Sequence, residues 1–178
     1  LCHCCGAGGL AILSKGELVA SDYLKARDVR GSWFPASRHV VQTPLGQVQT
    51  LNVHLRPQIS NSGSVIRGYF STPSVRRKEI DAYFDRLDDS LPTIVAGDFN
   101  ENKDGKAVHF LRKRGLRSAL PEFEPDADTW RWKTSIGTVH SQLDHITYDA
   151  RLDPIQATVL KEGRSDHWPI IATFVQAE

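Results

Sequence analysis

The sequence predicts a single α+β domain over residues 1–178, and three local patterns support this fold class. One is a short apolar run bounded by proline and glycine, which is typical of a strand buried on both faces. The second is a pair of alternating runs around a turn sequence, and the third is two stretches with helical spacing of apolar residues. In chain order these segments are the hairpin 37–53, the helix 74–87, the strand 93–96 and the helix 106–114. A chain of 178 residues is long enough to bury one core.

The composition excludes a protein that attracts nucleic acid or a membrane through its overall charge. Twenty-two basic and 21 acidic residues leave a net charge of +1, so any attraction for nucleic acid or a membrane must be local. No apolar run has the length of a membrane span and no signal-peptide pattern is present, so we expect a soluble protein. The chain begins at Leu1 and contains no Met, so we expect its natural start to lie elsewhere. A cytoplasmic and a secreted location both remain open.

All three cysteines lie within the first five residues. Cys4 and Cys5 are adjacent and do not converge easily on one ion, and no further cysteine completes a zinc site. We therefore interpret Cys2, Cys4 and Cys5 as thiols without a metal role. The segments 8–13 and 17–24 follow, and they predict two strands joined by a short turn.

The hairpin is predicted from its turn chemistry as well as from its alternation. Pro44 and Gly46 occupy the second and fourth positions of a four-residue turn, where both residue types are favoured. The second strand carries Asn52 and His54 two residues apart, so both side chains leave the same face near the strand end. A histidine there is structural more often than catalytic, and the residues alone leave both interpretations open.

Residues 56–74 are rich in Ser, Gly and Pro and predict a long loop. Long loops in compact domains are usually either functional or mobile. Tyr69 and Phe70 in this loop suit a lid over a substrate, and they equally suit an aromatic anchor that pins the loop to the body.

The two predicted helices carry most of the clustered basic residues. In the helix 74–87, Ile80 and Tyr83 begin a buried face, while Arg76 in the first turn indicates either an anionic neighbour or a solvated surface. The helix 106–114 ends at Gly115, a typical C-terminal cap. The densest basic patch of the chain follows its last turn: Arg112, Lys113, Arg114 and Arg117. This patch favours a phosphate-rich substrate, which makes Arg112 a candidate for substrate binding.

A carboxylate and an amide come directly after the predicted strand 93–96. In an extended backbone Asp98 and Asn100 leave the same face and Phe99 the other, so the two polar groups share one small volume. Such a pair makes a simple turn about as often as it forms a site, so the segment alone does not decide the function.

Aromatic and cationic residues alternate over 129–133. The alternation predicts a strand whose Trp130 either stacks on bases or sugars or packs in the core, and the core interpretation is the more common one. The last strands are expected at 143–148, 155–160 and 170–175.

Four short segments together resemble the motif set of the endonuclease/exonuclease/phosphatase superfamily of metal-dependent phosphoesterases. They are Asn52-Val53-His54-Leu55, Gly97-Asp98-Phe99-Asn100, Gln142-Leu143-Asp144-His145-Ile146 and Ser165-Asp166-His167 before an apolar strand. The segments occur in the expected order over nearly the whole chain, and the combination is far more specific than any one of them. The resemblance implies a four-layer α/β/β/α sandwich of two mostly antiparallel sheets with helices outside.

The resemblance also implies roles for individual residues. Asp98 would be the base or the carboxylate that orients water, and Asn100 would position phosphate or metal. Asp144 would orient His167, which would bind a phosphoryl oxygen or move a proton. Asp166 would be the carboxylate beside the metal, and hard oxygen ligands favour Mg2+ or Mn2+.

Other residues would contact the substrate around this centre. His54 occupies a position where the superfamily often has a histidine on the scissile phosphate. We expect Asn52, Arg112 and Trp130 to contribute to binding of a phosphate-ester substrate. His140 is interpreted as structural because it matches no motif.

Two motifs of the superfamily have no counterpart here, an Asn on the first strand and a metal-binding Glu in a Gln-Glu pair. Neither precedes Gly9, so we interpret the chain as a truncated member or as one that lacks this part of the site. Glu17 and Glu101 match no motif and are interpreted as surface carboxylates. A truncated chain would expose an apolar sheet edge, which would favour a homodimer.

The leading hypothesis is a divalent-metal phosphoesterase that hydrolyses phosphodiester bonds by in-line attack of an activated water. Within this class the basic patch and the aromatic strand favour a nuclease acting on DNA or RNA. A lipid or small-molecule phosphoesterase, similar to a sphingomyelinase or an inositol phosphatase, is the alternative. A non-catalytic remnant that binds phosphates is the hypothesis from a different class.

Overall fold

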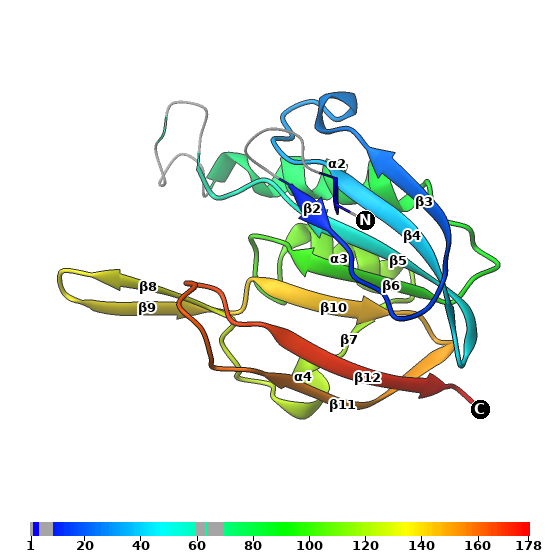
Figure 1. Ribbon diagram of the computed structural model, residues 1–178. Helices are drawn as coiled ribbons and strands as arrows, with labels where there is room; N and C mark the ends of the chain where they lie inside the picture. The colour runs from blue at the N-terminus through cyan, green and yellow to red at the C-terminus, as the bar shows by residue number, and fades with distance from the viewer. Residues whose placement is uncertain (1, 4–8, 60–62, 64–69) are drawn as a thin grey trace.

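The computed structural model describes residues 2–3, 9–59, 63 and 70–178. Its largest element is a six-stranded sheet (Figure 1). In spatial order the strands are β3 (Leu18–Leu24), β4 (Ala36–Thr43), β5 (Gly46–His54), β6 (Thr93–Asp98), β10 (Asp144–Tyr148) and β7 (Arg117–Ser118). Neighbouring strands are antiparallel, except that β5 and β6 are parallel. The parallel pair requires a crossover, which the chain makes through a helix.

Two helices, α2 (Pro73–Phe84) and α3 (Lys106–Lys113), cover one face of the six-stranded sheet. Ile80 and Tyr83 of α2 and Phe110 of α3 pack against Val53 and Val95 in one hydrophobic cluster. The amphipathic spacing predicted for both helices is therefore confirmed, and their apolar faces explain why they lie on the sheet.

A second, two-stranded sheet covers the opposite face. It consists of β11 (Leu152–Val159) and β12 (Ile170–Gln176), and the short helix α4 (Leu120–Phe123) packs beside it. Leu152 and Phe174 of this sheet pack against Ile94 and Tyr148 of the larger one. Two packed sheets with helices outside are the fold class that the sequence predicts. Strand β6 is covered on both faces, with Thr93 and Val95 buried on one and Ile94 and Ala96 half-buried on the other.

The local predictions agree closely with the observed boundaries. The hairpin 37–53 is formed by β4 and β5, with the turn at Pro44 and Leu45. The predicted helix 106–114 is α3, and Gly115 after it has the positive φ of a C-terminal cap.

The two strands predicted at 8–13 and 17–24 are present, and they do not pair with each other. The short strand β2 (Leu10–Ala11) pairs with β1 (Cys2–His3), whereas β3 pairs with β4. The reason is non-local, since the Asn52 side chain donates to the carbonyl of Ala11 and so attaches β2 beside β5. Cys4 and Cys5 lie outside the described residues.

A two-stranded ribbon, β8 (Trp130–Thr134) with β9 (Gly137–Ser141), extends from the body of the molecule (Figure 1). Trp132 is 55% exposed on it, so the core interpretation of this aromatic strand is wrong for that residue. In the long loop, Tyr69 lies outside the described residues, and Phe70 is 79% exposed. None of the described helices is both long and apolar enough to cross a membrane.

Candidate active site

Strand register brings three polar side chains to the same end of the six-stranded sheet. The parallel pairing of β5 with β6 sets His54 beside Asp98, and the antiparallel pairing of β6 with β10 sets Asp144 opposite Asp98. The His54 Nε2 atom lies 3.4 Å from the Asp98 Oδ2 atom. Residues that are far apart in the sequence therefore form one group because three neighbouring strands end together.

The backbone around Asp98 departs from the extended conformation that we expected. Asn100 has φ +52, in the left-handed region, because the strand ends at Asp98 and the chain turns there. The Asn100 side chain still lies beside the carboxylate, donating to Asp98 Oδ2 at 3.1 Å and to the Leu55 carbonyl at 3.0 Å. The Asn100 backbone N–H donates to Asp98 Oδ1 at 2.7 Å. These bonds fix the orientation of the Asp98 carboxylate.

His167 completes the group from the loop before β12. Its Nδ1 atom lies 2.8 Å from Asp144 Oδ2, and its Nε2 atom lies 3.9 Å from Asp98 Oδ2. Asp144 Oδ2 also accepts a hydrogen bond of 2.6 Å from the hydroxyl of Thr129. When the Nδ1–H group of His167 donates to Asp144, the Nε2 atom is left to face Asp98 and a substrate.

Sequence reasoning missed Thr129 and Phe34. Thr129 is fully buried, and its hydroxyl accepts the backbone N–H of Asp144 while it donates to the Asp144 carboxylate. The Phe34 ring stacks on His54 with 3.9 Å between ring centres and 11° between planes. Neither contact has a local sequence signal, because each joins residues that are well separated along the chain.

Charge and burial perturb the three central groups in different directions. Burial, with the nearby charge of Asp144, raises the pKa of Asp98 to about 7. Burial lowers the pKa of His54, and the neighbouring His167 lowers it further. The hydrogen bond to Asp144 raises the pKa of His167. Such opposed shifts within one cluster are characteristic of functional sites.

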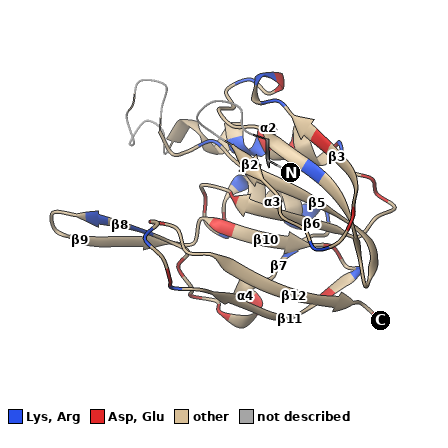
Figure 2. Ribbon diagram, in the orientation of Figure 1, with Lys and Arg blue, Asp and Glu red and all other residues tan. Residues whose placement is uncertain are grey.

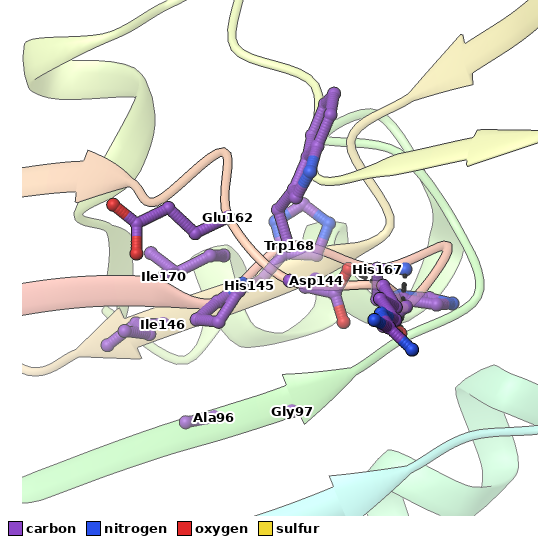
Figure 3. A pocket seen from close by; sticks show the side chains of 13 residues that line it. Ala96, Gly97, Asp144, His145, Ile146, Glu162, His167, Trp168 and Ile170 are labelled. Carbon is purple, nitrogen blue, oxygen red and sulfur yellow. Dashed lines mark hydrogen bonds and ion pairs between the residues drawn. The ribbon is translucent and has the colours of Figure 1, made fainter.

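A cavity of about 520 Å3 lies beside this group (Figure 3). It separates β6 and β10 from the loop that carries His167, and its lining includes Asp144, His167 and Arg164. A substrate group that enters this cavity meets the Asp144–His167 pair directly.

The structure does not bring every predicted site residue into the group. Asp166 points its Oδ2 atom at the indole N–H of Trp130, 3.2 Å away, and Trp130 lies with its ring centre 6.5 Å from that of His167. Asn52 bonds to the Ala11 carbonyl, lower on β5. Arg112 lies on α3, contacts His109 and lines a different hollow. Arg112 is therefore not part of the candidate active site.

The residues present fit a divalent cation. One ligand atom from each of Asp98, Asp144 and His167 lies within 4.8 Å of the others, which makes this group a candidate metal centre among the described residues. The raised pKa of Asp98 has the charge of Asp144 among its causes, and a cation between them would relieve that repulsion. Asp166 is not a member of this group.

The Glu101 interpretation is corrected by the structure. Glu101 is buried, with Oε2 at 2.9 Å from Arg76 Nε and Oε1 accepting the backbone N–H groups of Ala107 and Val108 at the start of α3. It is a structural carboxylate under the site and not a surface one. The anionic neighbour that Arg76 indicated is therefore internal.

The family model of the Endonuclease/Exonuclease/phosphatase family matches residues 2–167. The chain belongs to this family. A search of curated protein sequences finds no match.

Three solved structures of similar fold illustrate the range of the endonuclease/exonuclease/phosphatase family. The human Nocturnin catalytic domain with bound sulfate has TM-score 0.65 and 20% identity, over 90% of this chain and 60% of that one. Danio rerio TDP2 in complex with a single-stranded DNA product has TM-score 0.67 and 16% identity, over 90% of this chain and 68% of that one. The mannosyl-6-phosphatase Bt3783 of Bacteroides thetaiotaomicron has TM-score 0.68 and 16% identity, over 89% and 67%.

At these identities the similarity shows the DNase I-like fold and not the substrate. The chain spans 46% to 68% of the length of the solved structures compared with it. It has the phosphoesterase fold of a family with both nuclease and phosphatase relatives.

Proposed function

We propose that the protein is a divalent-metal phosphodiesterase that cleaves nucleic acid, and that residues 1–178 act as one catalytic domain. The observation that carries this proposal is the convergence of Asp98, Asp144 and His167 at one end of the sheet. A hydrolase of this kind needs a group that activates water, a positive charge on the phosphoryl oxygens and help for the leaving oxygen. The cluster supplies residues for the first two needs.

Asp98 is proposed to accept a proton from the attacking water, and Asn100 holds its carboxylate in place through the two hydrogen bonds described above. His167 is proposed to donate Nε2–H to a phosphoryl oxygen, with Asp144 fixing the ring orientation. His54, stacked on Phe34, is proposed to contact the phosphate from the neighbouring strand. The short distances from Asp98 Oδ2 to His54 Nε2, 3.4 Å, and to His167 Nε2, 3.9 Å, support these roles.

Mg2+ or Mn2+ is proposed as the cofactor, and the carboxylate oxygens of Asp98 and Asp144 would hold it, which leaves the Nε2–H of His167 for the phosphoryl oxygen. When bound, such an ion neutralises charge on the phosphoryl group and lowers the pKa of a coordinated water. Asp166, which the sequence suggested as a ligand, is not included in this set, because its carboxylate accepts the indole N–H of Trp130.

Hydrolysis assays test this proposal directly. Plasmid DNA, bis(p-nitrophenyl) phosphate and the monoester p-nitrophenyl phosphate are incubated with the parent protein in Mg2+, in Mn2+ and in EDTA. We expect metal-dependent cleavage of DNA, and its loss by at least about 100-fold in Asp98→Ala and His167→Ala. Asp153→Ala, an exposed carboxylate on β11, is the control and should retain parent turnover.

Three results would contradict the proposal in different ways. Cleavage of the monoester alone would indicate a phosphatase, the small-molecule alternative. Undiminished turnover in Asp98→Ala or His167→Ala would remove the assigned roles. No turnover with any metal, together with retained binding of phosphate esters, would indicate the non-catalytic remnant.

A further inference from the structure

The β8–β9 ribbon has two chemically different faces. Residues that pair directly across an antiparallel ribbon share a face. Trp130 pairs with Ser141 and Trp132 pairs with Val139, which gives one aromatic and apolar face. The intervening pairs, Arg131 with His140 and Lys133 with Thr138, give a cationic and polar face.

The polar face at the base of the ribbon is turned toward the body. The Arg131 guanidinium lies 4.6 Å from the ring centre of Trp168, and the His140 ring stacks on the same indole at 6.5 Å. Trp168 itself is buried. These contacts hold the ribbon so that its aromatic face is left open, with Trp132 55% and Val139 51% exposed.

The open face begins at the candidate active site. The Trp130 ring centre lies 6.5 Å from that of His167, and the Trp130 indole N–H donates to Asp166 at 3.2 Å, which fixes the ring. Trp132 stacks on Trp130 with 6.4 Å between ring centres and 11° between planes. A row of aromatic planes therefore runs from His167 outward along β8.

The charge of the ribbon suits a polyanion. Between Thr129 and Ser141 the sequence contains Arg131 and Lys133 and no acidic residue, and Figure 2 shows the basic colour on β8. Phosphate-bearing chains with planar groups match both properties, because the indole rings accept the planes while the positive charge on the other face of the thin ribbon attracts the backbone through space. Neither a neutral sugar nor an apolar peptide matches both.

We propose that the Trp130–Trp132 pair is a stacking platform for an unpaired base of a single-stranded nucleic acid whose neighbouring phosphate lies at His167. This inference rests on the proposed function and specifies its substrate. A base within a duplex has both faces occupied by its neighbours, so a tryptophan stacks readily only on an unpaired one. The platform therefore selects single strands or frayed ends.

The test measures binding without turnover. Fluorescein-labelled (dT)10 and a decamer of tetrahydrofuran abasic units carry the same phosphates, and anisotropy titrations in EDTA give the dissociation constant of each. We expect the parent to bind (dT)10 about tenfold more tightly than the abasic decamer. Trp132→Ala should abolish this difference, and Trp132→Phe should retain most of it. Lys133→Ala, on the other face, should weaken both ligands by the same factor.

Several outcomes would overturn the platform. Equal affinity of the parent for the two decamers would mean that only phosphates are bound. An unchanged preference in Trp132→Ala would place the base elsewhere. Sedimentation showing a parent dimer that Trp132→Ala dissociates would assign this face to self-association.

The same titrations separate this inference from the proposed function. Base-dependent binding that requires Trp132, together with absent hydrolysis, would support the stacking platform and contradict the proposed hydrolase activity. Metal-dependent hydrolysis without base-dependent binding would support the proposed hydrolase activity and contradict the stacking platform.

Discussion

The Nδ1 atom of His167 and the Oδ2 atom of Asp144 lie 2.8 Å apart, although Asp144 belongs to the larger sheet and His167 to the loop that leads into the smaller one. His167 precedes β12, and Asp144 begins β10. The contact therefore depends on how the smaller sheet packs against the larger one. Any change that shifts this packing would also change the orientation of the imidazole.

We expect Asp144→Asn to lower kcat by roughly 10²–10⁴-fold, because an amide can no longer accept the Nδ1 proton with a full negative charge or fix that tautomer. The variant should stay folded, since the Thr129 hydroxyl can still bond to the side-chain oxygen. Steady-state kinetics on the phosphodiester that the parent cleaves fastest measures kcat, and circular dichroism checks that the variant is folded. Asp153→Asn is the matched exposed control, and equal kcat values for the two variants would contradict a positioning role for Asp144.

Two neighbouring arginines on α2 should differ sharply in their contribution to stability. Arg76 is buried and pairs with Glu101 at 2.9 Å, whereas Arg77 pairs with Asp81 at the surface. Arg76→Met leaves a buried carboxylate without its partner, so we expect it to reduce the free energy of unfolding by about 3–5 kcal/mol. Arg77→Met should reduce it by about 0–1 kcal/mol. Urea denaturation of the two variants measures both values, and similar losses would show that the Arg76–Glu101 pair is replaceable.

The sequence predicts well those features that local patterns determine. The hairpin of β4 and β5 follows from alternation around Pro44 and Gly46, and β6 follows from a short apolar run with clear ends. The family motifs further predicted that Asp98, Asp144 and His167 converge, and the structure brings these side chains together.

Features that depend on distant partners were not predictable. The pairing of β2 with β1, the burial of Glu101 and the stacking of Phe34 on His54 each depend on a residue from another part of the chain. No periodicity encodes such contacts, since each residue type is also common at surfaces and in turns. The exposure of Trp132 was not predictable either, because the core was favoured only on the ground that tryptophans in strands are usually buried.

The backbone of Val53 approaches Gly97 closely, so we expect substitution of Gly97 to destabilise the protein more than substitution of a glycine with a similar φ and no close neighbour. Gly97 has φ +140, and a methyl group added there would lie 1.9 Å from the carbonyl oxygen of Val53. Gly137 has φ +146 with nothing within 4 Å of an added methyl group. We expect Gly137→Ala to cost about 1–3 kcal/mol from backbone strain alone, and Gly97→Ala to cost about 1–3 kcal/mol more because β5 must move.

Chemical denaturation measures the difference between the two glycine variants. Activity adds a second readout, because Asp98 follows Gly97 and would move with it, whereas Gly137 lies at the ribbon turn. Gly97→Ala at parent stability would show that β5 and β6 can separate without cost.

The pH dependence of stability should reveal the buried carboxyl group of Glu79. Its side chain is fully buried and accepts the backbone N–H of Arg56 at 2.8 Å. Burial raises the pKa of Glu79 above its usual value of 4.5. The folded protein therefore holds this proton more tightly than the unfolded chain does. The stability contributed by the protonated group is fully present below pH 4.5 and is lost as the pH rises through the folded-state pKa.

Glu79→Gln keeps the shape of the side chain and removes its titration, so its free energy of unfolding relative to the parent should increase as the pH rises from about 4 to 8. Glu17→Gln, on the exposed loop before β3, is the matched control for the Glu-to-Gln replacement itself. Urea denaturation at a series of pH values measures each difference. A constant offset between Glu79→Gln and the parent across this range would show that Glu79 ionises in the folded protein as easily as in the unfolded chain, with Arg56 and Arg76 fully compensating its burial.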